Sequence, residues 1–147
     1  MVRSADDPQV KEGEAARRTM FGDELVDRNY LGVSDFQRPV QEWLAGAVWA
    51  DVWTRKGIDR RTRSLVTIGM LAALNRPDEL EMHLSAAPRN GCTVGDIQEV
   101  LLHVAPYCGA PAALSSFRIA ERVLKRVGAL DTGDEAQMKG ADNGLRP

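Results

Sequence analysis

The sequence predicts an all-α domain of about six helices. Over most of the chain, apolar residues recur at the spacing of three and four residues that is typical of amphipathic helices. Strand signals are absent, because no run of β-branched residues alternates with polar ones. The 147 residues, 44% hydrophobic and 27% charged, suit one soluble domain with a core of its own. We expect this domain over residues 1–130 and a disordered tail over 131–147.

Two helices are expected in the first part of the chain. The first runs over about 8–29, where Met20 and Phe21 begin its apolar face and Gly22 is a point of interruption. The second runs from a cap at Ser34 or Asp35 to about residue 56, with Pro39 in its first turn. Its apolar residues place it against the core.

Four further helices are expected over 59–75, 77–90, 93–108 and 111–128. Asp59 caps the first of these, and Thr93 with Asp96 resembles a capping box. Residues 65–74 are apolar nearly all round, which is typical of a helix in the centre of a bundle or in a subunit interface. We therefore expect a homo-oligomer.

Charge and cysteine content exclude several classes of protein. A net charge of −2 argues against a broadly basic nucleic-acid-binding protein. No apolar run approaches the roughly 20 residues that span a bilayer, and the start of the chain lacks the apolar segment of a secretory signal. Cys92 and Cys108 are too few for a disulfide framework. We expect a cytoplasmic protein without nucleic-acid or membrane partners, with both cysteines as small buried residues.

His83 is the first candidate for chemistry. Glu79 lies four residues earlier on the same expected helix, so its carboxylate could hydrogen-bond the imidazole, raise its pKa and leave the other nitrogen to transfer a proton. From the spacing alone, a plain surface pair of the two side chains is the simpler interpretation. The sequence leaves both interpretations open.

His103 lies on the apolar face of its expected helix, where a histidine is usually a hydrogen-bonded core residue. We interpret it in that way, and we also count it among the candidate substrate-binding residues. Two histidines on different helices, without clustered cysteines, are a poor set of metal ligands. We therefore expect no metal site.

Trp49, Trp53 and Arg55 form a second candidate group. The two indoles lie four residues apart, so they are either core residues or the wall of a binding site. Arg55 could then hold a carboxylate in a bidentate contact. Arg61 belongs to a cluster of arginines at a helix N-terminus, a place that is unfavourable for cations and that favours an anionic partner.

Three segments together resemble the carboxymuconolactone decarboxylase family. They are EAARRTMFGDELVDR, VWADVWTRKGIDRRTRSLVTIGMLAAL and ELEMHLSAAPRNGCTVGDIQEVLLHVAPYCGAPAA, and the resemblance covers about residues 12–127. It implies an all-α fold shared with alkyl hydroperoxidase D-like proteins and commonly a homohexamer. The redox cysteines of the peroxidase branch would fall on Arg76 and Glu79, and its proton-relay glutamate on Ser64, so peroxidase activity is disfavoured.

The resemblance also implies a reaction, the decarboxylation of 4-carboxymuconolactone, a small dicarboxylate lactone. Its lactone carbonyl can take the charge that carbon dioxide leaves behind, so no cofactor is expected. We assign His83 as the acid, Glu79 as its orienting partner and Tyr107 as the donor to the enolate oxygen. Arg55 and Arg61 would hold the carboxylates, beside a wall of Trp49 and Trp53.

Other interpretations of the resemblance stay open. A family member could act on another acidic metabolite, or it could keep the fold and only bind a ligand. Pro88 and Pro106 lie within two expected helices, where each proline removes a backbone hydrogen bond and could reshape the site.

Overall fold

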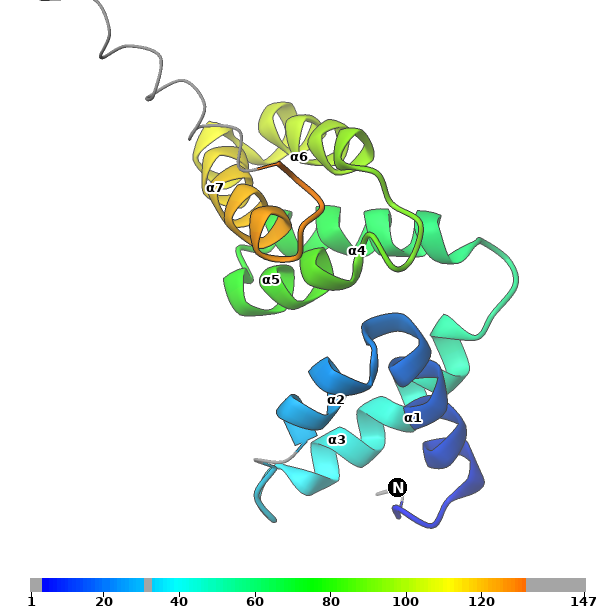
Figure 1. Ribbon diagram of the computed structural model, residues 1–147. Helices are drawn as coiled ribbons and strands as arrows, with labels where there is room; N and C mark the ends of the chain where they lie inside the picture. The colour runs from blue at the N-terminus through cyan, green and yellow to red at the C-terminus, as the bar shows by residue number, and fades with distance from the viewer. Residues whose placement is uncertain (1–3, 31–32, 132–147) are drawn as a thin grey trace, which may run out of the picture.

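Helices account for all regular structure in the computed structural model, which describes residues 4–30 and 33–131. They are α1 (Pro8–Phe21), α2 (Asp23–Tyr30), α3 (Arg38–Leu44), the π-helix η1 (Ala45–Trp53), α4 (Arg60–Ala73), α5 (Pro77–Ala86), α6 (Val94–Cys108) and α7 (Ala110–Arg126) (Figure 1). The all-α prediction is confirmed. Apart from Asp131, the predicted disordered tail lies outside the described residues.

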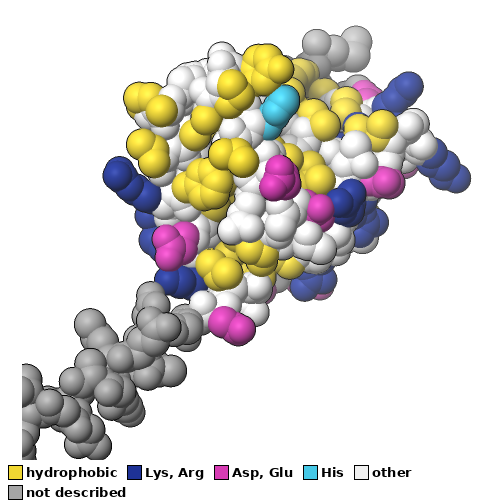
Figure 2. All heavy atoms as spheres, turned by 90° about the horizontal axis from the view of Figure 1, so that it is seen from above, with side chains coloured by type: hydrophobic (Ala, Val, Ile, Leu, Met, Phe, Trp, Pro, Cys, Tyr) yellow, Lys and Arg dark blue, Asp and Glu magenta, His cyan; other side chains and the backbone are white. Residues whose placement is uncertain are grey.

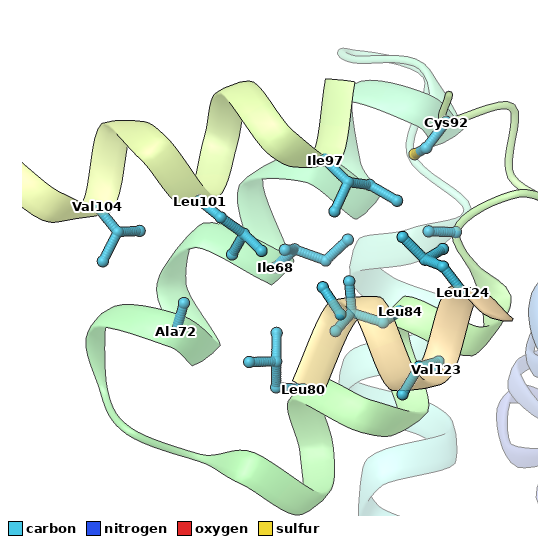
Figure 3. Packing of buried hydrophobic residues seen from close by; sticks show 12 residues of the cluster. Ile68, Ala72, Leu80, Leu84, Cys92, Ile97, Leu101, Val104, Val123 and Leu124 are labelled. Atoms are coloured by element: carbon cyan, nitrogen blue, oxygen red, sulfur yellow. The ribbon is translucent and has the colours of Figure 1, made fainter. Parts of the chain in front are cut away.

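The helices form two groups, each around its own apolar cluster. Helices α4 to α7 enclose the larger one, with Ile68, Leu80, Leu101 and Val123 among its members (Figure 3). Helices α1 to α3 and η1 lie together on the other side of Figure 1 and enclose a second cluster around Val10, Phe21 and Trp49. Helix α5 contributes Leu80 and Leu84 to the larger cluster and Ala86 to the second one. The two groups of helices therefore meet at α5.

Local sequence signals set most of the helix ends. Gly22 has a φ of 81°, which a residue with a side chain rarely adopts, and it divides the expected first helix into α1 and α2. The Asp59 carboxylate accepts a hydrogen bond from the Thr62 amide at 2.6 Å and caps α4. Thr93 and Asp96 form the predicted capping box at the start of α6.

The expected second helix is divided between α3 and η1. The π-helix packs tightly against α1, because a Cβ atom added to Gly13 would lie 1.8 Å from the carbonyl oxygen of Ala45. Glycine at this position therefore allows the two backbones to approach. Trp49 and Trp53 both lie on η1, so this contact positions them.

Two expectations about prolines and cysteines need correction. Helix α5 ends at Ala86, so Pro88 lies beyond it and does not interrupt it, whereas Pro106 does lie inside α6. Cys92 is buried as expected, but Cys108 is exposed because it ends α6 at the surface. None of the described helices could span a bilayer.

Candidate functional site

His83 lies where the two groups of helices meet, surrounded by aromatic rings. Its side chain comes from α5, and the residue is 9% exposed. The Phe21 ring of α1 packs edge-on at 5.2 Å between centroids. The rings of Trp49 and Trp53 lie at 6.3 and 5.9 Å, each within 28° of parallel to the imidazole. We call these four residues, together with Arg17, the His83 cluster.

The two faces of α5 explain why His83 points into this cluster. Leu80, Leu84 and Ala87 pack into the larger apolar core, on the side of α4, α6 and α7. Met82 and Ala86 contact the second core, on the side of α1 and η1. His83 turns to this second side, and α1 and η1 cover it. The structure thus unites three predicted site residues, His83, Trp49 and Trp53.

Arg17, which was not among the site residues expected from the sequence, also belongs to the cluster. It is 6% exposed, its Nη1 donates to Oε1 of Gln41 at 3.2 Å, and its guanidinium lies 5.6 Å from the centre of the Trp49 ring. A signal existed, because Val10, Gly13, Arg17 and Met20 follow a helical spacing and all are buried on α1. A charged residue on the buried face of a helix is a functional candidate.

The surroundings keep His83 uncharged at neutral pH. Burial is the main cause, and the positive charge of Arg17 adds to it, so the pKa of His83 falls to about 4. Glu79 favours the charged form, but it is exposed, and no hydrogen bond joins it to His83 among the described residues. The expected rise in the pKa of His83 is therefore wrong, because burial and Arg17 outweigh Glu79.

The indole of Trp49 contributes a buried polar group. Trp49 is 6% exposed, and its Nε1 has no hydrogen-bond partner in the described part of the chain. A buried donor without a partner costs about 1–3 kcal/mol of stability. The unpaired N–H lowers the stability of the fold, so the reason for its position is to be sought in function.

His103 and Tyr107 lie elsewhere, on α6. Their rings are 4.8 Å apart, and both line an apolar groove of about 630 Å³ between α4 and α6. Hydrophobic side chains gather on this face of the molecule (Figure 2). Tyr107 is 76% exposed and His103 is exposed as well, so the interpretation of His103 as a core residue is wrong. No described helix covers that side of α6.

The two predicted carboxylate-binding arginines also lie outside the His83 cluster. Arg61 holds Asp96 in a bidentate ion pair, with nitrogen–oxygen distances of 2.5 and 3.0 Å, and this lowers the pKa of Asp96 to about 2. The pair ties the start of α4 to the start of α6. Arg55 follows η1 and is exposed. Within the described residues, no three His, Cys, Asp or Glu side chains group as metal ligands would.

Comparison with known proteins gives consistent matches. The sequence profile of the carboxymuconolactone decarboxylase family matches residues 38–122, which include η1, α5 and α6. The 4-carboxymuconolactone decarboxylase of Acinetobacter baylyi is 40% identical over 123 residues, which cover 84% of this chain and 92% of that protein. The nitrosuccinic acid decarboxylase npaB of Metarhizium robertsii is 33% identical over 132 residues, covering 90% and 89%.

Proposed function

The chain belongs to the carboxymuconolactone decarboxylase family, and we propose that it converts 4-carboxymuconolactone to 3-oxoadipate enol-lactone, as a carboxy-lyase. The relatives named above are both decarboxylases, which supports this reaction type. The observation that carries the proposal is the His83 cluster, where an imidazole and a guanidinium are buried together among aromatic rings. The pathway would be aromatic-compound catabolism through β-ketoadipate.

The substrate supplies its own electron sink. When the bond to the departing carboxylate breaks, carbon dioxide leaves and the electron pair stays on the γ carbon of the ring. The ring double bond relays this charge to the lactone carbonyl oxygen, which gives a dienolate. A proton added at the α carbon then completes the product. The protein must therefore hold a carboxylate, stabilise an oxyanion and supply one proton.

His83 is the proposed proton donor. In the structure its imidazole is neutral at pH 7, with a pKa of about 4, and a neutral imidazole is a poor acid. The two carboxylates of the substrate would offset the charge of Arg17 and favour the charged form of His83. His83 would therefore take up a proton from solvent when the substrate binds. Glu79 would help from the surface by its charge, without direct contact.

Arg17 is the proposed anchor for the carboxylate that the reaction retains. A cation beside the departing carboxylate would stabilise the reactant more than the transition state, because that charge moves into the ring. The retained carboxylate keeps its charge, so holding it only orients the substrate. The indoles would leave the departing carboxylate in apolar surroundings, which favours its neutral product.

We propose a homohexamer, the assembly that the family resemblance implies, and the apolar groove between α4 and α6 supports a contact between copies of this chain. Val66 and Met70 on α4 line this groove and are 50% and 52% exposed. These side chains form an apolar surface of the kind that subunits bury. A second copy would also cover His103 and Tyr107. The two thiols suit a reducing compartment, so we propose that the assembly works in the cytoplasm.

Turnover by the purified protein tests the proposed reaction. We expect the wild type to release one carbon dioxide for each 4-carboxymuconolactone consumed. His83→Gln should release carbon dioxide far more slowly. Nitrosuccinate is the comparison substrate, because a relative at 33% identity is named for it. If the protein releases carbon dioxide from nitrosuccinate and leaves the lactone intact, the proposed substrate is wrong.

Light scattering tests the proposed assembly. Met70→Glu places a charge in the groove and should dissociate the hexamer. Gln37→Glu adds the same charge at an exposed position near α3 and serves as the matched control. A wild-type protein that is monomeric at micromolar concentration would contradict the hexamer.

A further inference from the structure

The indole N–H of Trp49 is a hydrogen-bond donor held inside the His83 cluster. Trp49 is 6% exposed, and Nε1 is one of two buried side-chain polar atoms that lack a partner in the described part of the chain. The other atom, Oδ1 of Asn90, is an acceptor on a residue whose amide nitrogen donates to Ser64 at 3.0 Å. Only the Trp49 atom lies among groups that could act on a substrate.

The neighbours of this indole are the groups that the proposed reaction uses. Its ring lies 6.3 Å from the imidazole of His83 and 5.5 Å from the ring of Trp53. The guanidinium of Arg17 lies over it at 5.6 Å. A ligand held by Arg17 and protonated by His83 would therefore lie beside Trp49.

The proposed reaction needs a hydrogen-bond donor to the enolate oxygen. Tyr107 was expected to stabilise the enolate oxygen, but it lies on α6 and is 76% exposed in the α4–α6 groove. Among the aromatic residues around His83, Phe21 has no donor and Trp53 is only partly buried. Trp49 has both a donor and the burial that makes its hydrogen bond strong.

We propose that the Trp49 indole N–H donates a hydrogen bond to the lactone carbonyl oxygen of the substrate and stabilises the dienolate. This inference rests on the proposed function. The bond to the departing carboxylate breaks, its electron pair moves through the ring to the carbonyl oxygen, and carbon dioxide leaves. The N–H keeps its proton throughout. The α carbon receives its proton from the His83 imidazolium.

Two features suit the indole to this role. Its position is set by the packing of η1 against α1, so the donor needs no reorganisation when charge develops. The Arg17 cation over the ring face draws electron density from the indole, which makes the N–H a stronger donor. The hydrogen bond would therefore strengthen as the carbonyl oxygen becomes an oxyanion.

Removal of the N–H alone is the sharpest test. Site-specific replacement of Trp49 with 3-benzothienylalanine keeps the bicyclic ring and puts sulfur where the N–H was. We expect kcat to fall about 10²–10³-fold, the usual effect of losing one oxyanion donor, with KM within about threefold of wild type. Trp49→Phe should lose at least as much. Trp43→Phe, on an exposed indole of α3, is the matched control and should keep the wild-type rate.

A binding measurement separates this inference from the proposed function. Muconolactone has the same lactone ring and acetate arm but no departing carboxylate. On saturation with muconolactone, the indole ¹H resonance of Trp49 should move downfield, and that of Trp43 should not. This readout tests the hydrogen bond from Trp49 to the lactone carbonyl by itself. If the wild type failed to decarboxylate 4-carboxymuconolactone, the proposed function and the role of Trp49 in the dienolate would be overturned, whereas the binding contact would still be decided by the resonance.

The contrary outcomes are equally specific. Wild-type kcat in the benzothienylalanine enzyme would show that the N–H takes no part, while the proposed decarboxylation would stand. An unmoved Trp49 resonance at saturating muconolactone, or no binding of muconolactone, would overturn the inference as well.

Discussion

The two histidines of this chain occupy opposite surroundings, and each lies in the place that the sequence favoured for the other: His103 was expected in the core and His83 had a plain surface pair with Glu79 as one open interpretation. His83 on α5 is 9% exposed and is covered by α1 and η1. His103 on α6 is exposed beside Tyr107, at an apolar groove that no described helix covers. The difference teaches that the pattern of one helix does not decide whether a histidine on it is buried, because burial depends on which other helices pack against that face.

This difference also decides which histidine can respond to a ligand. His83 lies in a low-dielectric site, where Arg17 and Glu79 act on it from α1 and α5, while η1 contributes neutral indoles. A bound carboxylate would change its charge state strongly in such a site. The exposed ring of His103 is surrounded by solvent in a single chain, and its proposed place is an interface between subunits.

Replacing each histidine should give the largest contrast. We expect His83→Ala to lower kcat for 4-carboxymuconolactone by about 10²–10⁴-fold, the range for loss of a general acid. His103→Ala should stay within about threefold in kcat. Steady-state kinetics of the folded variants would measure both. Should the order be reversed, the acid lies on α6 and the His83 cluster is a structural core.

The stability of the protein in acid should depend on His83. The folded state holds the pKa of His83 at about 4, below its ordinary value of 6.5, so the unfolded state binds more protons between these values. Stability is therefore lost as pH falls from 6.5 to 4, by up to about 3 kcal/mol.

Urea unfolding at pH 7.5 and pH 4.5 would measure this dependence. His83→Gln should remove most of the His83 contribution, and His103→Gln is the control on an exposed ring. An identical pH dependence in the wild type and His83→Gln would show that the pKa of His83 is the same in the folded and the unfolded protein, and would contradict the lowered pKa.

Arg17 should distinguish substrate binding from chemistry. A charged hydrogen bond to a carboxylate contributes about 1.5–3 kcal/mol, so Arg17→Gln should raise KM about 10–100-fold. Arg17→Lys should recover part of this loss. Arg18→Gln is the matched control, because Arg18 is the next residue but pairs with Asp23 and Asp27 at the surface. An unchanged KM in Arg17→Gln would place the carboxylate elsewhere.

Glu79 should have the smallest effect. Its carboxylate is exposed and makes no hydrogen bond to His83 among the described residues, so Glu79→Gln should change kcat by less than about threefold. A pH–rate profile of this variant would show whether Glu79 acts by charge alone. A loss as large as that of His83→Ala would restore Glu79 as a direct partner.

The sequence alone determined the helices and part of the site. Spacing and caps predicted α4, α6 and α7 closely, because the Asp59 and Thr93 caps are local interactions. The same spacing placed Trp49 and Trp53 together, since residues four apart share a helix face. His83 became a candidate because histidine can transfer protons near neutral pH and because its position matches a histidine of the family.

Tertiary structure decided what each of these residues can do. The close contact of α1 with η1 buries Arg17 and leaves the Trp49 N–H without a partner among the described residues, and neither fact is written in local spacing. Burial by α1 and η1 also turned the expected rise in the pKa of His83 into a fall. Desolvation depends on which helices cover a side chain, so it follows from packing between segments distant in sequence.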